Sequence, residues 1–127
     1  MSQQHKILIV DDDHDTHHFI ADLLDMYGYE ATCIHSSATA REIIPREPPD
    51  FLILDLHIDE RYAGWLLLQD LRTDPATASI PAVLATSDRE FVQRHRNEVQ
   101  ALGGEVLEKP FDPHKLIERV QATLGGV

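Results

Sequence analysis

The feature that most constrains the fold is a run of four apolar residues, from Phe51 to Leu54, that ends at Asp55. A strand that is apolar at every position is typical of a parallel sheet covered by helices on both faces. Sheets of this kind bind ligands beyond the carboxyl ends of their strands, which is where Asp55 would stand. Asp55 is therefore the first candidate for a reactive group.

Other apolar runs end at polar residues in the same way. Residues 7–10 lead into three consecutive aspartates, residues 82–85 lead into Thr86, and the shorter run 106–107 leads towards Lys109. Because the carboxyl ends of parallel strands meet at one edge of a sheet, this arrangement predicts a shared site. The side chains expected to meet there are Asp11, Asp12, Asp55, Thr86 and Lys109.

The segments between these runs carry apolar residues at the spacing of amphipathic helices. Ser36 or Ser37 can cap the second helix, which Pro45, Pro48 and Pro49 prevent from continuing. Gly28 and Asp112 mark the end of the first helix and the start of the last. The predicted helices cover 15–27, 37–44, 64–73, 89–102 and 113–124, and one more strand covers 29–34. Strands that alternate with helices imply a parallel sheet with right-handed crossovers. We therefore expect an α/β fold, a three-layer sandwich with helices on both faces of a sheet of about five strands.

The length and charge of the chain narrow its function. Its 127 residues fit one compact domain. The formal net charge of -11 opposes direct binding to nucleic acid or anionic lipid and favours a partner with a basic face. No apolar stretch is long enough to span a bilayer, so we expect a cytoplasmic protein without a membrane contact. Cys33, the only cysteine, is expected to be a small core residue of a strand.

The predicted cluster of acids requires a positive charge, since neighbouring carboxylates repel one another and are costly to bury unpaired. A hard divalent cation, Mg2+ in particular, suits an all-oxygen site, and Lys109 can supply a further charge. A carboxylate, a metal ion, an ammonium group and a hydroxyl are the parts required for phosphoryl transfer to an aspartate. Asp55 would attack phosphorus, and Thr86 could hydrogen-bond a phosphoryl oxygen.

Four motifs, in the right order and over nearly the whole chain, resemble the receiver domain of two-component response regulators. They are Ile-Leu-Ile-Val-Asp-Asp-Asp at 7–13, Pro-Asp-Phe-Leu-Ile-Leu-Asp-Leu at 49–56, Ile-Pro leading to Ala-Thr-Ser at 80–87, and Glu-Lys-Pro-Phe-Asp at 108–112. The resemblance identifies residues 1–127 as one receiver domain. It implies a flavodoxin-like sheet with the strand order 2-1-3-4-5.

The resemblance implies phosphorylation of Asp55 by a sensor histidine kinase or a histidine phosphotransfer protein, followed by slow self-catalysed loss of the phosphoryl group. Thr86 would be the switch hydroxyl, Lys109 would pair with the phosphoryl group, and Ser87 would be a small neighbour of its pocket. The phosphorylated domain would then change its contacts with a downstream protein target. It would be a stand-alone receiver or a piece of a larger protein.

Mg2+ is the cofactor that the resemblance implies. Its ligands would be Asp55, the acidic pair Asp11 and Asp12, of which Asp12 is the more direct ligand, and the backbone carbonyl of His57. The alternating aspartates at 11, 13 and 15 also look like a calcium loop, but Thr16 stands where such a loop needs glycine. Three histidines in the same stretch are expected to be solvated rather than to bind a metal, namely His14, His17 and His18.

Two departures from the family pattern affect these expectations. Asp59 stands where a proline is common, and the usual glycine comes one residue late, at Gly64, so the loop after Asp55 is expected to be one residue longer. Val106 stands where an aromatic switch residue is often found, three positions before the lysine. The output signal is therefore expected to travel through the helix at 89–102 or through the loop.

Two other functions stay open on the sequence alone. A degenerate receiver would bind a partner without being phosphorylated. The Asp-x-Asp pattern also resembles the opening of haloacid dehalogenase-type phosphohydrolases, with Asp11 as nucleophile and Asp13 as acid, although that class is usually longer. Trp65, near the start of the third predicted helix, is either exposed for docking or packed in the core.

Overall fold

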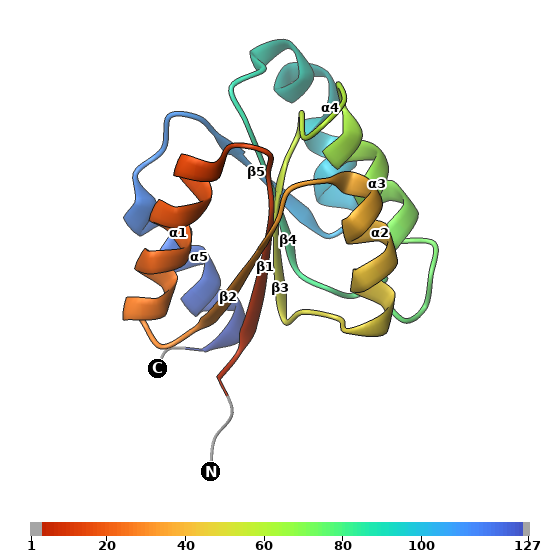
Figure 1. The fold of residues 1–127 in the computed structure, drawn as a ribbon. Coiled ribbons are helices and arrows are strands. Elements are labelled where there is room, and N and C mark those ends of the chain that lie inside the picture. The colour runs from red at the N-terminus through yellow and green to blue at the C-terminus, as the bar shows by residue number, and fades with distance from the viewer. Residues whose placement is uncertain (1–3, 126–127) are drawn as a thin grey trace.

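The structure is a computed structural model that describes residues 4–125. Strands and helices alternate along the chain, beginning with a strand and ending with a helix (Figure 1). The strands are β1 (Lys6–Val10), β2 (Glu30–Ile34), β3 (Phe51–Asp55), β4 (Ala82–Thr86) and β5 (Gly104–Glu108). The helices are α1 (His14–Met26), α2 (Ser37–Arg46), α3 (Ala63–Leu71), α4 (Arg89–Ala101) and α5 (Pro113–Leu124).

The strands form one parallel sheet in the order β2-β1-β3-β4-β5, which confirms the predicted topology. The central strand is β3, and its register places Leu54 beside Val10 of β1 and Asp55 beside Ala85 of β4. Strands paired in this way finish at nearly the same level. The residues that follow them are therefore brought to one edge of the sheet.

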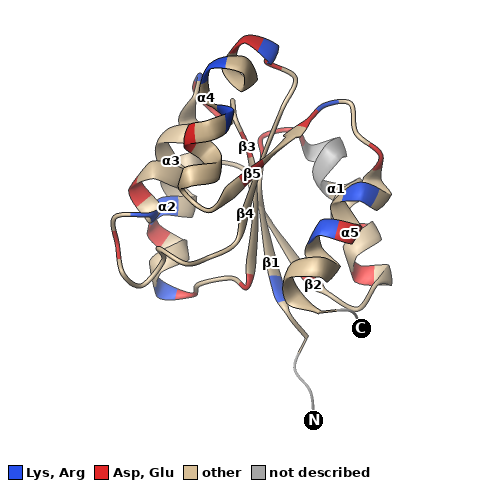
Figure 2. Ribbon diagram, turned by 180° about the vertical axis from the view of Figure 1, so that it is seen from behind, with Lys and Arg blue, Asp and Glu red and all other residues tan. Residues whose placement is uncertain are grey.

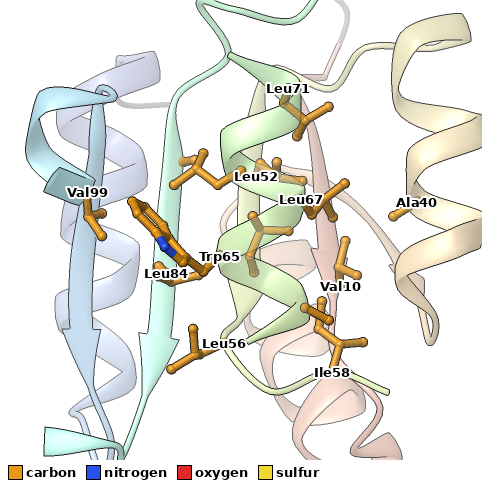
Figure 3. Packing of buried hydrophobic residues seen from close by; sticks show 14 of the residues in the cluster. Val10, Ala40, Leu52, Leu56, Ile58, Trp65, Leu67, Leu71, Leu84 and Val99 are labelled. Atoms are coloured by element: carbon orange, nitrogen blue, oxygen red, sulfur yellow. The ribbon is translucent and has the colours of Figure 1, made fainter. Parts of the chain in front are cut away.

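Helices cover both faces of the sheet, with α1 and α5 on one face and α2, α3 and α4 on the other (Figure 1). Successive residues of a strand point to opposite faces. Ile9 and Ile53 accordingly pack into the cluster with α1 and α5, whereas Leu52 and Leu54 join the cluster of the other three helices, part of which Figure 3 shows. Charged residues lie mainly on the helices and loops, and the strands are largely free of them (Figure 2).

The helix α2 ends before Pro48 and Pro49, as expected, but it includes Pro45 and so runs two residues beyond Ile44. The helix continues one residue beyond Pro45, and the N–H of Glu47 still donates to the carbonyl of Ile43 at 2.9 Å. Because the proline stands in the last turn, the helix loses one hydrogen bond and ends before further turns are disturbed. The predicted start is confirmed, since the Ser36 side chain accepts a hydrogen bond from the N–H of Thr39.

Trp65 is buried, with 8% of its surface exposed, so the packed alternative is confirmed and the exposed one is wrong. Its ring meets the ring of Phe91 edge to face, with 5.7 Å between the centroids. The neighbouring Leu66 is the exposed apolar residue instead. Cys33 is partly buried against the cluster formed with α1 and α5, as expected, and burial raises the pKa of its thiol.

The length of the helices determines whether any of them could cross a membrane. Within residues 4–125, no helix combines the length and the apolar character needed to cross a membrane. The longest helices, α1 and α4, have 13 residues each, well short of the ~20 apolar residues that a spanning helix needs.

Candidate functional site

The polar edge of the sheet is built by strands that end side by side. Asp11 and Asp55 directly follow the paired residues Val10 and Leu54. On the opposite side, the backbone N–H of Lys109 donates to the carbonyl of Thr86 at 2.8 Å and extends the ladder between β4 and β5. The peptide bond between Lys109 and Pro110 is cis. The lysine thus reaches the same edge as the acids.

Three carboxylates meet at this edge, as the topology predicted. Asp11, Asp12 and Asp55 each offer one oxygen, and these oxygens lie within 4.8 Å of one another. Asp11 is buried, Asp55 is partly buried and Asp12 is exposed. Nζ of Lys109 lies 2.8 Å from Oδ1 of Asp55 and 3.9 Å from Oδ2 of Asp11. The cluster therefore holds three carboxylates and one ammonium group, which contacts Asp55 and approaches Asp11.

The electrostatics of Asp55 reflect this imbalance of charge. Burial raises the pKa of the Asp55 carboxyl above its ordinary value. The hydrogen bond and the charge of Lys109 act in the opposite direction, and the nearby charges of Asp11 and Asp12 raise the pKa further. A second cation would relieve the repulsion between the acids. The donor atoms are all carboxylate oxygens, which is the ligand type that Mg2+ prefers.

Thr86 and Ser87 stand beside the lysine. The side chain of Thr86 is almost fully buried, and its Oγ1 accepts a hydrogen bond from the N–H of Asp88 at 3.0 Å. A hydroxyl that accepts in this way keeps its own O–H for another acceptor. Thr86, Ser87 and Lys109 line one small cavity together with Pro110. The structure thus brings both predicted hydroxyl residues to the lysine.

The imidazole of His57 has partners that the sequence did not indicate. Its Nδ1 accepts the backbone N–H of Tyr62 at 3.0 Å, and its Nε2 lies 3.2 Å from Oδ2 of Asp88. Asp88 in turn caps α4, because its Oδ1 accepts the N–H of Phe91 at 3.0 Å. An aspartate directly before a predicted helix was the signal that could have found this cap. The backbone carbonyl of His57 as a metal ligand stays a prediction.

Asp59 ties the loop after Asp55 to the start of α2. The backbone N–H and the hydroxyl of Ser37 donate to its carboxylate at 3.0 and 2.9 Å. Burial raises the pKa of the Asp59 carboxyl, but hydrogen bonds from Ser37 and from the loop backbone outweigh burial and lower the pKa overall. Asp59 therefore fixes the loop by hydrogen bonding at the position where the family resemblance leads one to expect proline.

Gly64 lets α3 pass directly against the strand that carries the candidate nucleophile. Its N–H donates to the carbonyl of Leu56 at 2.8 Å. A Cβ added to Gly64 would lie 2.0 Å from the backbone oxygen of Asp55 and 2.9 Å from its carbonyl carbon. No residue with a side chain fits this approach. Glycine is therefore required here by the packing of α3 on β3.

The structure also bears on the alternative sites. In the part of the chain whose side chains are described, one group of three potential metal ligands is found, and it contains no histidine. His18 is exposed, whereas the side chains of His14 and His17 lie outside the described residues. The backbone N–H of Asp13 donates to Oδ1 of Asp11 at 3.0 Å. The lysine lies closer to Asp55 than to Asp11, which favours Asp55 as the central carboxylate.

Comparison with known sequences identifies relatives over almost the whole chain. Residues 7–121 match the family of the response regulator receiver domain. The phosphate regulon transcriptional regulatory protein PhoB of Pseudomonas aeruginosa is 32% identical over 121 residues, a match that covers 93% of this chain and 51% of PhoB. Protein Rrf1 of Nitratidesulfovibrio vulgaris is 28% identical, over 94% of this chain and 83% of Rrf1. The chain thus spans about half the length of PhoB and most of the length of Rrf1.

Solved structures share the fold. A putative response regulator from Chloroflexus aurantiacus superposes with a TM-score of 0.84 at 29% identity, over 96% of this chain and 98% of that one. The chemotaxis response regulator CheY4 of Vibrio cholerae gives a TM-score of 0.82 at 22% identity, over 95% and 99% of the two chains. The receiver domain of the sensor histidine kinase PA1611 from Pseudomonas aeruginosa, described with a magnesium ion coordinated in its active site cleft, gives 0.81 at 22% identity, over 98% and 100%. With its flavodoxin-like sheet and its family match over residues 7–121, this chain belongs to the response regulator receiver domain family of two-component signalling.

Proposed function

We propose that this chain is a phosphoacceptor that takes a phosphoryl group on Asp55 in a Mg2+-dependent reaction. The observation that carries the proposal is the position of Lys109, whose Nζ lies 2.8 Å from Oδ1 of Asp55 at the edge of a cluster of three acids. A carboxylate, a fixed ammonium group and the buried hydroxyl of Thr86 thereby share one site. This combination suits phosphoryl transfer to a carboxylate.

In the proposed reaction, Asp55 is the nucleophile. A carboxylate oxygen of Asp55 attacks the phosphorus of a phosphohistidine on a sensor kinase or phosphotransfer protein, and the new O–P bond forms as the P–N bond breaks. The electron pair of the broken bond leaves with the donor imidazole. Lys109 balances charge on the phosphoryl oxygens, and the hydroxyl of Thr86 donates to one of them. Attack of water on phosphorus later releases inorganic phosphate and restores the Asp55 carboxylate.

Mg2+ fits the site because three carboxylate oxygens converge there. When bound, the ion would add positive charge that relieves the repulsion between the acids and the incoming phosphoryl oxygens. We propose that the ligands from the chain are Asp11, Asp12, Asp55 and the backbone carbonyl of His57. The same fold is described with a magnesium ion in the active site cleft of the PA1611 receiver domain.

Phosphorylation is proposed to change the surface that the domain offers to a downstream protein. PhoB is named a transcriptional regulatory protein, but it is about twice as long as this chain, and residues 7–121 here match the receiver domain. The net charge of -11 also opposes direct contact with nucleic acid. The proposed partners are therefore a histidine kinase or phosphotransfer protein upstream and a protein target downstream, all in the cytoplasm.

Intact-mass spectrometry tests the proposal. Incubation with acetyl phosphate and Mg2+ should add the mass of one phosphoryl group, stable in acid and removed by mild base, and chelation of the metal should prevent the addition. The variant Asp55→Asn keeps the size of the side chain but lacks the nucleophilic carboxylate, so it should remain unmodified at this position. An unmodified wild-type protein under these conditions would support a degenerate receiver that binds its partner without phosphorylation.

The phosphohydrolase alternative makes a different prediction. If Asp11 were the nucleophile of a phosphatase, the wild-type protein would steadily hydrolyse a phosphate ester such as p-nitrophenyl phosphate. Asp11→Asn would then abolish this turnover, whereas Asp55→Asn would retain it. Under the proposed function no such steady turnover is expected, and both variants should differ from wild type in acceptance of a single phosphoryl group.

A further inference from the structure

The imidazole of His57 uses both of its ring nitrogens to join two loops. Nδ1 accepts the backbone N–H of Tyr62 in the loop between β3 and α3, which assigns the ring proton of the neutral imidazole to Nε2. Nε2 can then donate to Oδ2 of Asp88 at 3.2 Å, in the loop between β4 and α4. His57 thus links the loop that follows Asp55 to the loop that follows Thr86.

Asp88 connects this link to the start of α4 and to the switch hydroxyl. Its Oδ1 accepts the N–H of Phe91 at 3.0 Å and caps α4. Its own N–H donates to Oγ1 of Thr86 at 3.0 Å. A displacement of Thr86 or of the His57 ring would therefore move Asp88, the residue that caps the first turn of α4.

The aromatic residues next to His57 extend the same connection. Tyr62 adopts a left-handed backbone conformation with φ of 63°, and its ring stacks on Phe91 of α4 with 5.9 Å between centroids. Trp65 of α3 packs against Phe91 and against His95 of α4, at 5.7 and 5.9 Å. The only tryptophan of the chain is consequently in contact with the part of α4 that the Asp88 cap controls.

Val106, at the position in β5 where an aromatic switch residue is often found, offers no comparable movable ring. Val106 is 9% exposed, packs in the cluster with α2, α3 and α4, and has a short β-branched side chain with restricted rotation about χ1. A change at Thr86 therefore has a hydrogen-bonded route to α4 through Asp88, and a change in the loop after Asp55 has one through His57.

We propose that His57 is a positioning residue that couples the loop following Asp55 to the cap of α4, so that occupation of the site changes α4 through the His57–Asp88 contact. The proposal rests on the proposed phosphoacceptor function, because it assumes that the site is occupied during signalling. The phosphoacceptor function concerns the chemistry at Asp55, whereas His57 would determine how occupation of the site changes the surface at α4. The coupling adds the imidazole of His57 and the carboxylate of Asp88 to the residues that matter for output.

The test measures binding and coupling separately. Calorimetry with beryllium fluoride and Mg2+ reports occupation of the site, and the emission of Trp65 reports the change at α4. His57→Ala removes both hydrogen bonds of the ring. Asp88→Asn retains a good N-cap for α4 but places an amide where His57 needs an acceptor. His114→Ala, on α5 and outside this network, is the matched control.

The wild-type protein and His114→Ala should bind the probe and change their Trp65 emission. Asp88→Asn should bind within about threefold of wild type, because Asp88 is not among the proposed metal ligands, yet lose most of the Trp65 response. In His57→Ala, whose backbone carbonyl is a proposed metal ligand, the Trp65 response at saturating probe should fall in the same way. His57→Gln, which can still donate an N–H to Asp88, should recover part of it. A full Trp65 response in His57→Ala, or none in a wild-type protein that binds the probe, would overturn the coupling. A wild-type protein that binds no probe and accepts no phosphoryl group would overturn the phosphoacceptor function itself.

Discussion

Gly64→Ala is the substitution whose outcome the structure specifies most sharply. In an open helix position, alanine would stabilise the protein by about 1 kcal/mol relative to glycine. Here the new Cβ would lie 2.0 Å from the backbone oxygen of Asp55, which is 1.4 Å inside the 3.4 Å at which ordinary contact begins. Backbone cannot rotate away as a side chain does, so α3 or β3 has to move. We expect a net loss of about 3 kcal/mol, at the upper end of the cost of overpacking.

The same clash should impair phosphorylation, because the displaced strand carries Asp55. A shift of about 1 Å at a reacting group can cost roughly 100-fold in rate. Urea denaturation measures the stability, and the rate of mass increase with acetyl phosphate measures the chemistry. Gly103→Ala is the control, since its φ of 74° makes alanine unfavourable by about 1–2 kcal/mol while the nearest atom is 4.0 Å away. A Gly64→Ala protein as stable and as reactive as wild type would refute this account of the loop.

Three further predictions follow from charge and burial. Asp55→Asn should raise the melting temperature at neutral pH, because the folded state raises the pKa of Asp55 above its ordinary value of 3.8. The free energy of unfolding of the wild type should therefore fall as pH rises from 3.8 through the raised pKa. Thermal melts across pH should show this loss in the wild type and not in the variant. Mg2+ at 100 times its dissociation constant should stabilise wild type by about 3 kcal/mol in thermal melts, and Asp12→Asn should lose most of this gain. Arg72→Ala should cost about 2–4 kcal/mol in urea denaturation, because the partly buried guanidinium donates to the backbone carbonyls of Thr77, Ile80 and Leu102.

Each of these predictions has an outcome that contradicts it. If the melting temperature changed with pH in the same way in Asp55→Asn and in wild type, the folded state would not disfavour the ionised form of Asp55. Equal stabilisation of Asp12→Asn and wild type by Mg2+ would place the ion elsewhere. Arg94→Ala, which removes an exposed pair with Glu90, is the control for Arg72→Ala and should cost less than about 1 kcal/mol. Similar losses in the two arginine variants would remove any special role for Arg72.

The residues that meet at the sheet edge could be predicted because their signals are local. Asp55 directly follows a fully apolar run, and Lys109 follows a strand that pairs with the strand of Thr86. Because the strands are parallel, the ends of β1, β3, β4 and β5 then meet in one site without further information. The strand order came from family resemblance, because periodicity alone does not determine which strands are neighbours.

The contacts that the sequence did not reveal are side-chain pairs between distant segments. Asp59 and Ser37 are separated by 22 residues, and His57 and Asp88 by 31, and no spacing rule connects either pair. The helix α2 ends two residues later than Ile44 for a different reason, since Pro45 lies in its last turn. The rule that proline ends a helix applies to interior turns, and it loses force where few hydrogen bonds remain to be broken.

The central place of β3 in the sheet has a consequence for the motions of the site. Its amides pair with β1 and β4 on both sides and should be among the slowest of the chain to exchange with deuterium, because their release requires global unfolding. Arg61 and Glu60, on the exposed loop beyond it, should exchange through local opening. We therefore expect the candidate nucleophile to stay anchored in the most persistent part of the molecule, while the exposed tip of the neighbouring loop, between the hydrogen bonds of Asp59 and Tyr62, opens more often.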